Sequence, residues 1–218
     1  MSKCLIGEDL KGINLNQLKT IKMKDNNSKP PSTGEQFNKV YRLPLVPWVW
    51  GDTRIPKELD ELVKTNKPKT SLELGCGLGR LTKYMASQGI KATGVDFSSV
   101  AIENAKKRVA NDESKPTFIA GDVTNLEGIK QMFDISYDVG CFHCLNEDGQ
   151  QKYVLEIYRL LKPGGYHLIW AIDDAPSDIK LNPGYIAKIF KPGFQLVNSK
   201  FSRRRLIASH WYWLVRNK

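Results

Sequence analysis

The sequence contains no long apolar run and few cysteines. Nothing in its 218 residues approaches the roughly 20 consecutive apolar residues of a membrane-spanning helix. The first residues turn acidic at Glu8 and Asp9, so we expect no secretory signal there. Four cysteines are too few for a disulfide scaffold of this size. We therefore expect a reduced, cytoplasmic protein that does not enter a membrane.

A second absence concerns metal sites. The segment 141–144, Cys-Phe-His-Cys, invites a metal or redox interpretation. Zinc sites usually combine two such elements, and the sequence has no second one. We therefore expect no metal in this protein.

Composition and charge describe an ordinary globular chain whose basic excess is uneven. Hydrophobic residues make up 41% and charged residues 26%, which excludes wholesale disorder. The net charge is +10. Residues 1–69 hold 13 Lys and Arg against 8 Asp and Glu, residues 70–175 hold 11 against 14, and residues 176–218 hold 9 against 1. The middle is mildly acidic, so the basic excess lies at both ends of the chain.

The pattern of the middle and C-terminal parts predicts an α/β fold. Strand-like runs are expected at 70–74, 91–95, 117–120, 137–142 and 166–172, with helices at 79–88, 98–110 and 149–161 between them. A helix at 57–64 precedes this series. After a short helix at 183–190, strands at 194–200 and 206–216 form a hairpin, in which the alternation places Trp211 and Trp213 on one face. We predict a doubly wound, mostly parallel seven-stranded sheet with a C-terminal antiparallel hairpin.

The most informative motif is a glycine-rich loop between the first strand and the first helix. Its sequence over 73–80 is Glu-Leu-Gly-Cys-Gly-Leu-Gly-Arg. Glycines let the backbone turn tightly and approach a ligand at the start of a helix. A dinucleotide site prefers G-x-G-x-x-G, and here the third glycine comes one position early. Glu73, directly before the loop, would repel a pyrophosphate and suits a cationic ligand.

Two further acids follow the next two strands. Asp96 ends the second strand, where a carboxylate can accept both hydroxyls of a ribose, and Phe97 beside it can pack on an adenine ring. Asp122 follows the third strand, where it can accept from an exocyclic amine. The alternative is that both acids are N-caps of the helices that follow them.

Together these motifs resemble those of class I S-adenosylmethionine-dependent methyltransferases. Residues 73–79 resemble the first motif of that family, Asp96 its ribose acid, Asp122 its adenine-site acid, and 161–165 the turn before its fifth strand. The resemblance implies S-adenosyl-L-methionine as cofactor. The site residues it implies are Trp48, Glu73, Leu74, Gly75, Cys76, Gly77, Gly79, Asp96, Phe97, Asp122, Val123 and Cys141. It also implies a methyltransferase domain over 45–218, preceded by an N-terminal segment, 1–44, that is partly flexible or forms a lid.

The acceptor side is narrowed mainly by exclusion. After the fourth strand there is no Asn/Asp-Pro-Pro-Tyr/Phe motif of the enzymes that methylate base amino groups, and no Pro-Cys nucleophile for cytosine C5 occurs. The lead-in at 45–56, which contains Trp48 and Trp50, resembles that of small-molecule methyltransferases of the thiopurine and tellurite-resistance type. That resemblance favours a sulfur-type or other soft acceptor. Both tryptophans could equally be core residues.

Four residues are candidates for contact with the acceptor: Trp50, Phe142, His143 and Asp173. His143 is also the candidate general base, because histidine exchanges protons near neutral pH. A packing role for His143, and a capping role for Asp173, are the alternatives. We expect methyl transfer to a small molecule. Two other hypotheses stay open: an RNA methyltransferase that uses Arg203–Arg205 beside the C-terminal aromatic residues, and a cofactor-binding partner subunit without activity. The arginine run is otherwise a solvated hairpin turn, and the sequence leaves the oligomeric state unknown.

Overall fold

The computed structural model describes residues 33–42, 54–174, 179–203 and 208–218. All of them lie in one unit, Pro31–Lys218. Within these residues, no helix combines the length and apolar character needed to cross a membrane. Trp48, Trp50, Arg204 and Arg205 fall outside the described residues.

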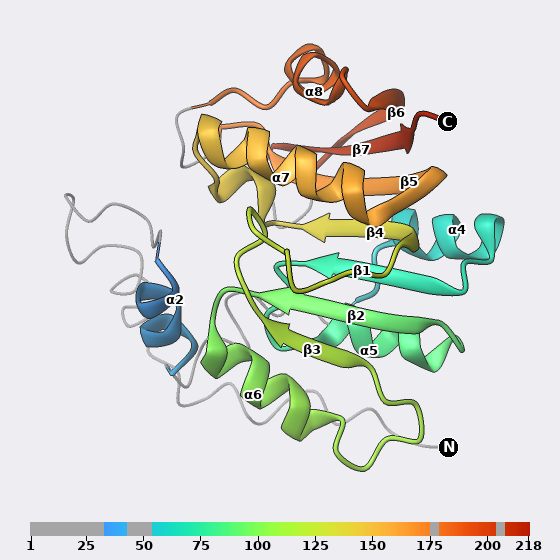
Figure 1. The fold of residues 1–218 in the computed structure, drawn as a ribbon. Helices are drawn as coiled ribbons and strands as arrows, with labels where there is room; N and C mark the ends of the chain where they lie inside the picture. The colour runs from blue at the N-terminus through green and yellow to red at the C-terminus, as the bar shows by residue number, and fades with distance from the viewer. Residues whose placement is uncertain (1–32, 43–53, 175–178, 204–207) are drawn as a thin grey trace, which may run out of the picture. The chain divides into compact units, whose positions relative to one another are not determined.

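The described strands form one seven-stranded sheet in the order β3-β2-β1-β4-β5-β7-β6 (Figure 1). The parallel strands are β1 (Thr70–Leu74), β2 (Lys91–Asp96), β3 (Thr117–Ala120), β4 (Phe133–Val139) and β5 (Leu161–Ile172). The last two, β6 (Phe194–Ser202) and β7 (Ser209–Arg216), pair antiparallel, and β7 also pairs antiparallel with β5. The predicted fold class is confirmed.

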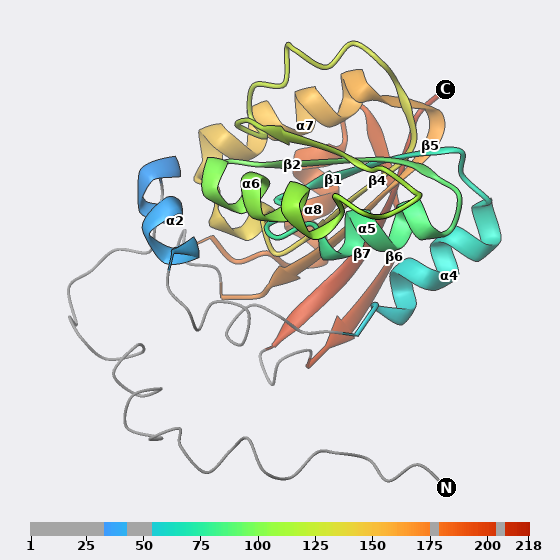
Figure 2. The same cartoon turned by 90° about the horizontal axis from the view of Figure 1, so that it is seen from below.

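Helices cover both faces of the sheet (Figure 2). On one face α4 (Lys57–Asn66) and α5 (Arg80–Ser87) pack with β2, β4, β5 and β7 around a cluster that includes Met85, Tyr137 and Trp211. On the other face α7 (Glu147–Leu160) and α8 (Pro183–Phe190) enclose a larger cluster. A third, smaller cluster lies between α6 (Ser99–Arg108) and β3. The sheet is therefore buried on both sides, as its apolar strands require.

Most element boundaries agree with the sequence pattern, but the fourth strand does not. It was expected over 137–142, whereas β4 begins at Phe133 and ends at Val139. Asp134 explains the earlier start, because its carboxyl group accepts from the backbone N–H groups of Lys69 and Thr70 at 2.8 Å and so fixes β4 beside β1. The last residues of the predicted strand instead form a loop and a 3₁₀ turn, η1 (Phe142–Cys144).

The C-terminal hairpin follows its predicted alternation. Trp211 and Trp213 pack with the cluster under α4 and α5, and Tyr212 between them packs with the opposite cluster. The two indoles therefore share a face, as the period of a strand requires.

One helix was not predicted. For residues 34–41 of the N-terminal segment, 1–44, no helix was proposed, yet α2 spans Gly34–Tyr41. Thr33 caps it by accepting from the N–H of Gln36, whose side chain accepts from the N–H of Thr33 in return. This T-x-x-Q spacing is the capping-box signal that the sequence does contain. Asn38 on α2 then ties this helix to α6, because its side-chain oxygen accepts from Ser98 Oγ at 2.6 Å and from the N–H of Val100 at 3.2 Å.

Candidate functional site

The candidate site lies at the carboxyl edge of the parallel strands. β1 pairs with β2 on one side and with β4 on the other, so the strand order reverses at β1. Ligands of open α/β sheets bind outside the carboxyl ends of the strands at such a reversal. The glycine loop after β1, the end of β2 and the loop after β4 all reach this edge.

The glycine loop owes its path to three residues with positive φ. Gly75, Gly77 and Gly79 have φ of 69°, 52° and 74°. Side chains are excluded here by close contacts as well as by strain. A Cβ on Gly77 would lie 2.7 Å from the hydroxyl of Tyr41, and one on Gly79 would lie 2.5 Å from the ring of Phe118. Gly79 thus allows the start of α5 to pack against β3. Gly75 and Gly77 place backbone without a side chain at the carboxyl edge of the sheet.

Asp96 joins the first two strand ends. Its Oδ2 accepts from the N–H of Gly77 at 2.7 Å and its Oδ1 from the N–H of Ser98 at 2.9 Å. Burial raises the pKa of Asp96, and these two N–H groups oppose that rise. The helix-cap alternative does not hold, because Ser98 is the residue that caps α6 by accepting from Ala101. Phe97 next to it is 42% exposed, so its ring is available to a ligand.

Glu73 points into the protein. Its carboxyl group accepts hydrogen bonds from the hydroxyls of Thr82 and Tyr137, and only 4% of the residue is exposed. Burial raises the pKa of Glu73 to about 8, although both hydroxyls and Arg80 lower it. A group that keeps its proton at neutral pH offers little charge to a cation. The structure therefore gives no support to the predicted attraction of Glu73 for a cationic ligand and places the residue in a supporting role.

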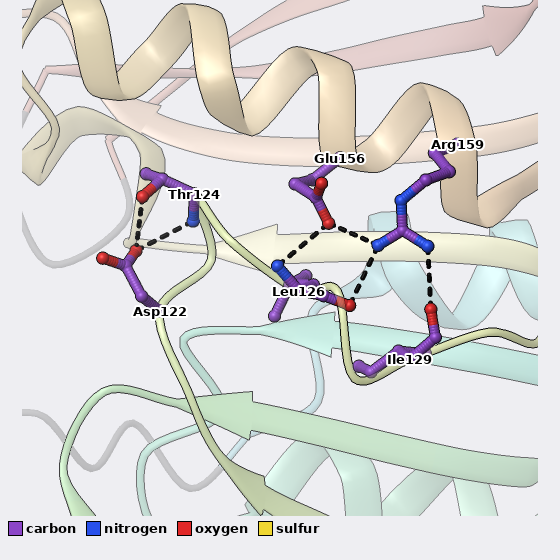
Figure 3. A network of polar contacts seen from close by, with 6 residues as sticks. All are labelled: Asp122, Thr124, Leu126, Ile129, Glu156 and Arg159. Carbon is purple, nitrogen blue, oxygen red and sulfur yellow. Dashed lines mark hydrogen bonds and ion pairs between the residues drawn. The ribbon is translucent and has the colours of Figure 1, made fainter.

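Asp122 organises the loop after β3 (Figure 3). Its Oδ1 accepts from the backbone N–H of Thr124 at 2.8 Å and from its hydroxyl at 2.7 Å. The same loop is held on α7, where Glu156 accepts from the N–H of Leu126 and Arg159 donates to the carbonyl groups of Leu126 and Ile129. A turn-forming role for Asp122 is thus present, and it engages only one of the two carboxyl oxygens in these bonds.

The loop after β4 is organised by Asp138. The carboxyl group of this fully buried residue accepts from the backbone N–H groups of Gly140, Cys141 and Phe142 at 2.7–2.9 Å. Tyr153 on α7 donates to it as well, at 3.1 Å. Burial raises the pKa of Asp138 to about 6 against the effect of these donors. Asp138 therefore fixes the loop that carries Cys141 and His143, a role that sequence analysis missed.

Three predicted site residues turn out to be core residues. Leu74 and Phe142 are fully buried and Val123 is 6% exposed. The ring of Phe142 packs against those of Tyr153 and Phe190, with centroids 5.1 and 5.7 Å away. The structure therefore gives the predicted contact of Phe142 with a substrate no support, and it places the side chains of Leu74 and Val123 in the core.

Cys76 lies in the loop after β1, and Cys141 lies in the loop after β4. Cys76 is 6% exposed and Cys141 is partly buried, and burial raises the pKa of both thiols. Among the described residues, no group of three or more His, Cys, Asp or Glu side chains could hold a metal ion.

His143 packs more than it faces solvent. It is 6% exposed, its ring lies edge-on to Trp170 with centroids 6.0 Å apart, and its Nδ1 accepts from the N–H of Ile172 at 3.5 Å. Asp173 is the other described candidate for contact with the methyl acceptor. It pairs with His210, whose Nδ1 lies 2.6 Å from Oδ1 of Asp173. The structure thus separates these two candidates into different environments.

Tyr41 is a site residue that sequence analysis missed. Its hydroxyl approaches the backbone of Gly77, and burial raises its pKa, with further contributions from Asp96, Cys76 and Cys141. Tyr41 therefore lies against the same loops that Asp96 joins. The residue is contributed by α2, which only the capping box of Thr33 could have revealed.

Comparisons with known proteins agree with this geometry. Residues 72–165 match the family described as methyltransferase domain. An uncharacterized methyltransferase of Schizosaccharomyces pombe is 33% identical over 89 residues, which cover 41% of this chain and 61% of that protein. The tRNA N(3)-methylcytidine methyltransferase trm140 of the same organism is 30% identical over 53% of this chain and 40% of its own length. The 2-heptyl-1-hydroxyquinolin-4(1H)-one methyltransferase of Mycobacteroides abscessus is 29% identical over 61% of this chain and 60% of its own. The chain thus spans about two fifths to three fifths of the length of these relatives.

Solved structures extend the likeness to most of the chain. The N-methyltransferase NodS from Bradyrhizobium japonicum, in complex with S-adenosyl-L-homocysteine, superposes with a TM-score of 0.68 at 16% identity over 86% of this chain and 100% of that one. TehB from Haemophilus influenzae gives 0.64 at 19% identity over 79% of this chain and 65% of that one. At these identities the likeness is one of fold. Residues 72–165 therefore match a methyltransferase-domain family, and the described residues share the mostly parallel, seven-stranded fold of these two solved structures.

Proposed function

We propose that this chain binds S-adenosyl-L-methionine at the carboxyl edge of β1, β2 and β4 and transfers its methyl group to a small-molecule acceptor. The observation that carries the proposal is Asp96, a buried carboxyl group that is tied to the backbone of Gly77 and lies beside the exposed ring of Phe97. A ribose needs such a pair of acceptor oxygens, and an adenine needs such a ring. Gly75 and Gly77 bring backbone without side chains to the same edge, where Cys141 and Tyr41 lie against them.

The residues of this chain then have separate tasks. Asp96 would accept from the ribose hydroxyls, Phe97 would pack on the adenine, and the second oxygen of Asp122 is suited to an exocyclic amine. The loop that Asp138 fixes would place Cys141 at the methionine side. When bound, S-adenosylmethionine supplies a methyl group on a sulfonium leaving group. What remains for the protein is to align the acceptor and exclude water, which can account for several kcal/mol of the barrier.

A small-molecule acceptor is favoured by two likenesses. The chain resembles a methyltransferase named for a hydroxyquinolinone, and its fold resembles TehB. The predicted lead-in with Trp48 and Trp50 is of the thiopurine and tellurite-resistance type, which favours sulfur-type or other soft acceptors. The predicted division into an N-terminal segment, 1–44, and a domain, 45–218, is part of this proposal. In it, α2 contributes Tyr41 from the N-terminal segment.

An RNA acceptor is the second candidate. It is supported by the 30% identity to a tRNA methyltransferase and by the basic residues at the C-terminal end of the chain. The described residues of that region place Arg203 over the ring of Phe201, with 5.8 Å between the guanidinium carbon and the centroid. Such a cation–π pair uses the arginine locally, which is the arrangement of a surface hairpin.

Calorimetry with S-adenosylmethionine tests the cofactor assignment. Asp96→Ala should weaken binding at least about 30-fold, because a buried acceptor pair to the ribose is lost and its absence costs about 2 kcal/mol or more. Asp112→Asn is the matched control, since Asp112 pairs with Lys83 and follows α6 at the opposite edge of the sheet. Unchanged affinity in Asp96→Ala, in a variant that unfolds at the wild-type temperature, would reject the assignment.

Two assays decide between the acceptor classes. A labelled-methyl screen over thiols, phenols, halides and amines should identify a small-molecule acceptor. A gel-shift titration with bulk tRNA at several salt concentrations should show only weak binding that disappears near physiological salt. Methylation of tRNA together with silence in the small-molecule screen would favour the RNA candidate. Cofactor binding with silence in both assays would favour a partner subunit without activity.

A further inference from the structure

We propose that His210 and Asp173 form a proton-accepting pair on the acceptor side of the site, with His210 as the general base and Asp173 as the residue that positions it. The inference rests on the proposed function and narrows it. A base is needed only if the acceptor atom carries a proton, so the pair points to thiol or hydroxyl acceptors rather than halides.

The two residues meet at the carboxyl edge of the sheet, although 37 positions separate them. Asp173 directly follows β5, and His210 is the second residue of β7. Because β5 and β7 are antiparallel, with Ala171 opposite His210, the end of one strand lies beside the start of the other. The N–H of Asp173 also donates to the carbonyl of Ala208 at 3.0 Å, which fixes the two segments together. β5 is the direct neighbour of β4, whose following loop carries Cys141 and His143.

The hydrogen bond between the two side chains determines which ring nitrogen is available. An ionised carboxylate only accepts, so Nδ1 of His210 must donate to Oδ1 of Asp173 across the 2.6 Å that separate them. In the neutral ring, Nε2 then carries the free lone pair. Within the described ranges, Nε2 has no hydrogen-bond partner. The side chains of His210 and Asp173 are 19% and 27% exposed, which leaves the pair open to small molecules.

The ring of His210 is also held in place by its neighbours. It stacks on Tyr212 with centroids 5.7 Å apart and an interplanar angle of 18°, and Phe201 meets it edge-on at 5.4 Å. Tyr212 is anchored in turn, because its hydroxyl donates to the carbonyl of Leu181 at 2.5 Å. A base that is fixed before the acceptor arrives loses little freedom on binding, which is the requirement for efficient proton transfer.

The other two histidines of the chain are poorer bases. His143 is 6% exposed, and its Nδ1 already accepts from the N–H of Ile172. His167 is fully buried between Ser136 and Tyr153, and burial lowers its pKa to about 3. Of the three, His210 alone combines a carboxylate partner with partial exposure.

The chemistry of the step balances without a further reactant. The S–H or O–H bond of the acceptor breaks, and its proton goes to Nε2 of His210. The electron pair of that bond forms the new bond to the methyl carbon. The bond between the methyl carbon and the sulfonium breaks, and its electrons stay on the sulfur as a neutral thioether.

The ring nitrogens of His210 can be observed directly. In the ¹⁵N-labelled chain, we expect the neutral form of the imidazole to carry its proton on Nδ1 and to give a pyridine-type signal from Nε2. In Asp173→Asn the amide can donate to Nδ1, so the proton should move to Nε2. The control Asp112→Asn should leave the pattern as in wild type, because Asp112 pairs with Lys83 and not with His210. Its side chain is 26% exposed, close to the 27% of Asp173. A wild-type proton on Nε2 would overturn the proposal.

Kinetics with proton-bearing and proton-free probes separates a base from a structural residue. With 2-mercaptoethanol or phenol as acceptor, His210→Gln should lower kcat about 100-fold or more, the usual contribution of a general base. With iodide, which has no proton to give, the same variant should keep its rate within about twofold, since no base acts there. Asp173→Asn should also lower kcat with 2-mercaptoethanol or phenol, by a smaller factor, and should leave the rate with iodide unchanged. The KM for S-adenosylmethionine should not change in either variant.

The outcomes distinguish this inference from the proposed function. If wild type transfers methyl groups but His210→Gln slows all acceptors alike, or none, His210 is not the base and only this inference fails. The same holds if wild type methylates iodide alone. If wild type binds no S-adenosylmethionine by calorimetry, the proposed function fails, and this inference fails with it.

Discussion

The α-carbon of Gly75 lies directly against the side chain of Cys141. A Cβ on Gly75 would lie 2.6 Å from Cβ and 3.1 Å from Sγ of Cys141. The loop after β1 and the loop after β4 therefore touch through a position where no side chain fits. Because these loops border the point at which the strand order reverses, their contact sets the shape of the candidate cofactor site.

Gly75→Ala should damage both stability and cofactor binding. The positive φ alone costs an alanine about 1–2 kcal/mol, and the collision with Cys141 adds about 1–3 kcal/mol. Gly89→Ala is the matched control, because Gly89 has a φ of 78° and nothing within 4 Å of its added Cβ. Urea unfolding and calorimetry with S-adenosylmethionine measure the two effects. Equal losses in the two variants would mean that the contact with Cys141 is unimportant.

Glu73 should make the protein less stable as pH rises. Burial raises the pKa of Glu73 from 4.5 to about 8, so above pH 4.5 the native state holds a proton that the unfolded chain has lost. The resulting stabilisation is complete below pH 4.5 and is lost by about pH 8, roughly 3–5 kcal/mol in all. Glu73→Gln should remove this dependence and still accept from Thr82. The measurement is the free energy of unfolding at a series of pH values.

The upper part of that pH range isolates Glu73. The pKa of Asp138, raised by burial from 3.8 to about 6, produces a fall of the same sign that ends near pH 6. A slope between pH 6 and 8 that persists in Glu73→Gln would therefore contradict the assignment. Glu73→Gln should bind S-adenosylmethionine within a few-fold of wild type, because the carboxyl group of Glu73 in the wild type bonds to Thr82 and Tyr137 inside the protein. Loss of binding would restore the direct role in cofactor binding that the sequence suggested.

Asp138→Asn should disorganise the loop after β4. An amide cannot accept from all of the groups that now donate to Asp138, so a buried N–H loses its partner at a cost of about 2–4 kcal/mol. Tyr153→Phe removes one donor to Asp138 and the contact of the same hydroxyl with Nε2 of His167, but it leaves the carboxylate bonded to the backbone, so it should cost less, about 1–2 kcal/mol. Urea unfolding of both variants, together with their affinity for S-adenosylmethionine, measures how much the loop after β4 contributes to stability and to cofactor binding. Equal costs would indicate that the backbone contacts of Asp138 do not matter.

Arg159→Ala should weaken cofactor binding from a distance. Arg159 donates to the carbonyl groups of Leu126 and Ile129 at 2.9 and 2.8 Å, and Glu156 pairs with it at 2.5 Å. Loss of this clamp frees the loop that begins at Asp122, and the affinity for S-adenosylmethionine should fall about 3- to 10-fold, roughly one lost hydrogen bond. Lys152→Ala on the same helix breaks an exposed pair with Asp148 and leaves the hydrogen bonds of the loop intact, so it should change the affinity less than twofold.

The sequence by itself determined the alternation of strands and helices, the loop of Gly75, Gly77 and Gly79, and the acids that follow successive strands. These are local features: a period of two or of 3.6, a residue without a side chain where φ must be positive, and a carboxylate at a strand end. They suffice for the fold class and for the position of Asp96, because parallel strands bring their carboxyl ends to one edge. They could not tell that Phe142 packs against Tyr153 and Phe190 in the core.

Only the tertiary structure decided which groups face one another. Glu73 and Thr82 meet because alternate residues of a strand point to opposite faces, and one of those faces carries α5. His210 and Asp173 meet because β7 runs antiparallel beside β5. Such pairs depend on strand order and on the helix that covers a face, and both are set by packing between distant segments. No local pattern encodes them, so the charge of Glu73 and the choice of a base became visible only in the folded chain.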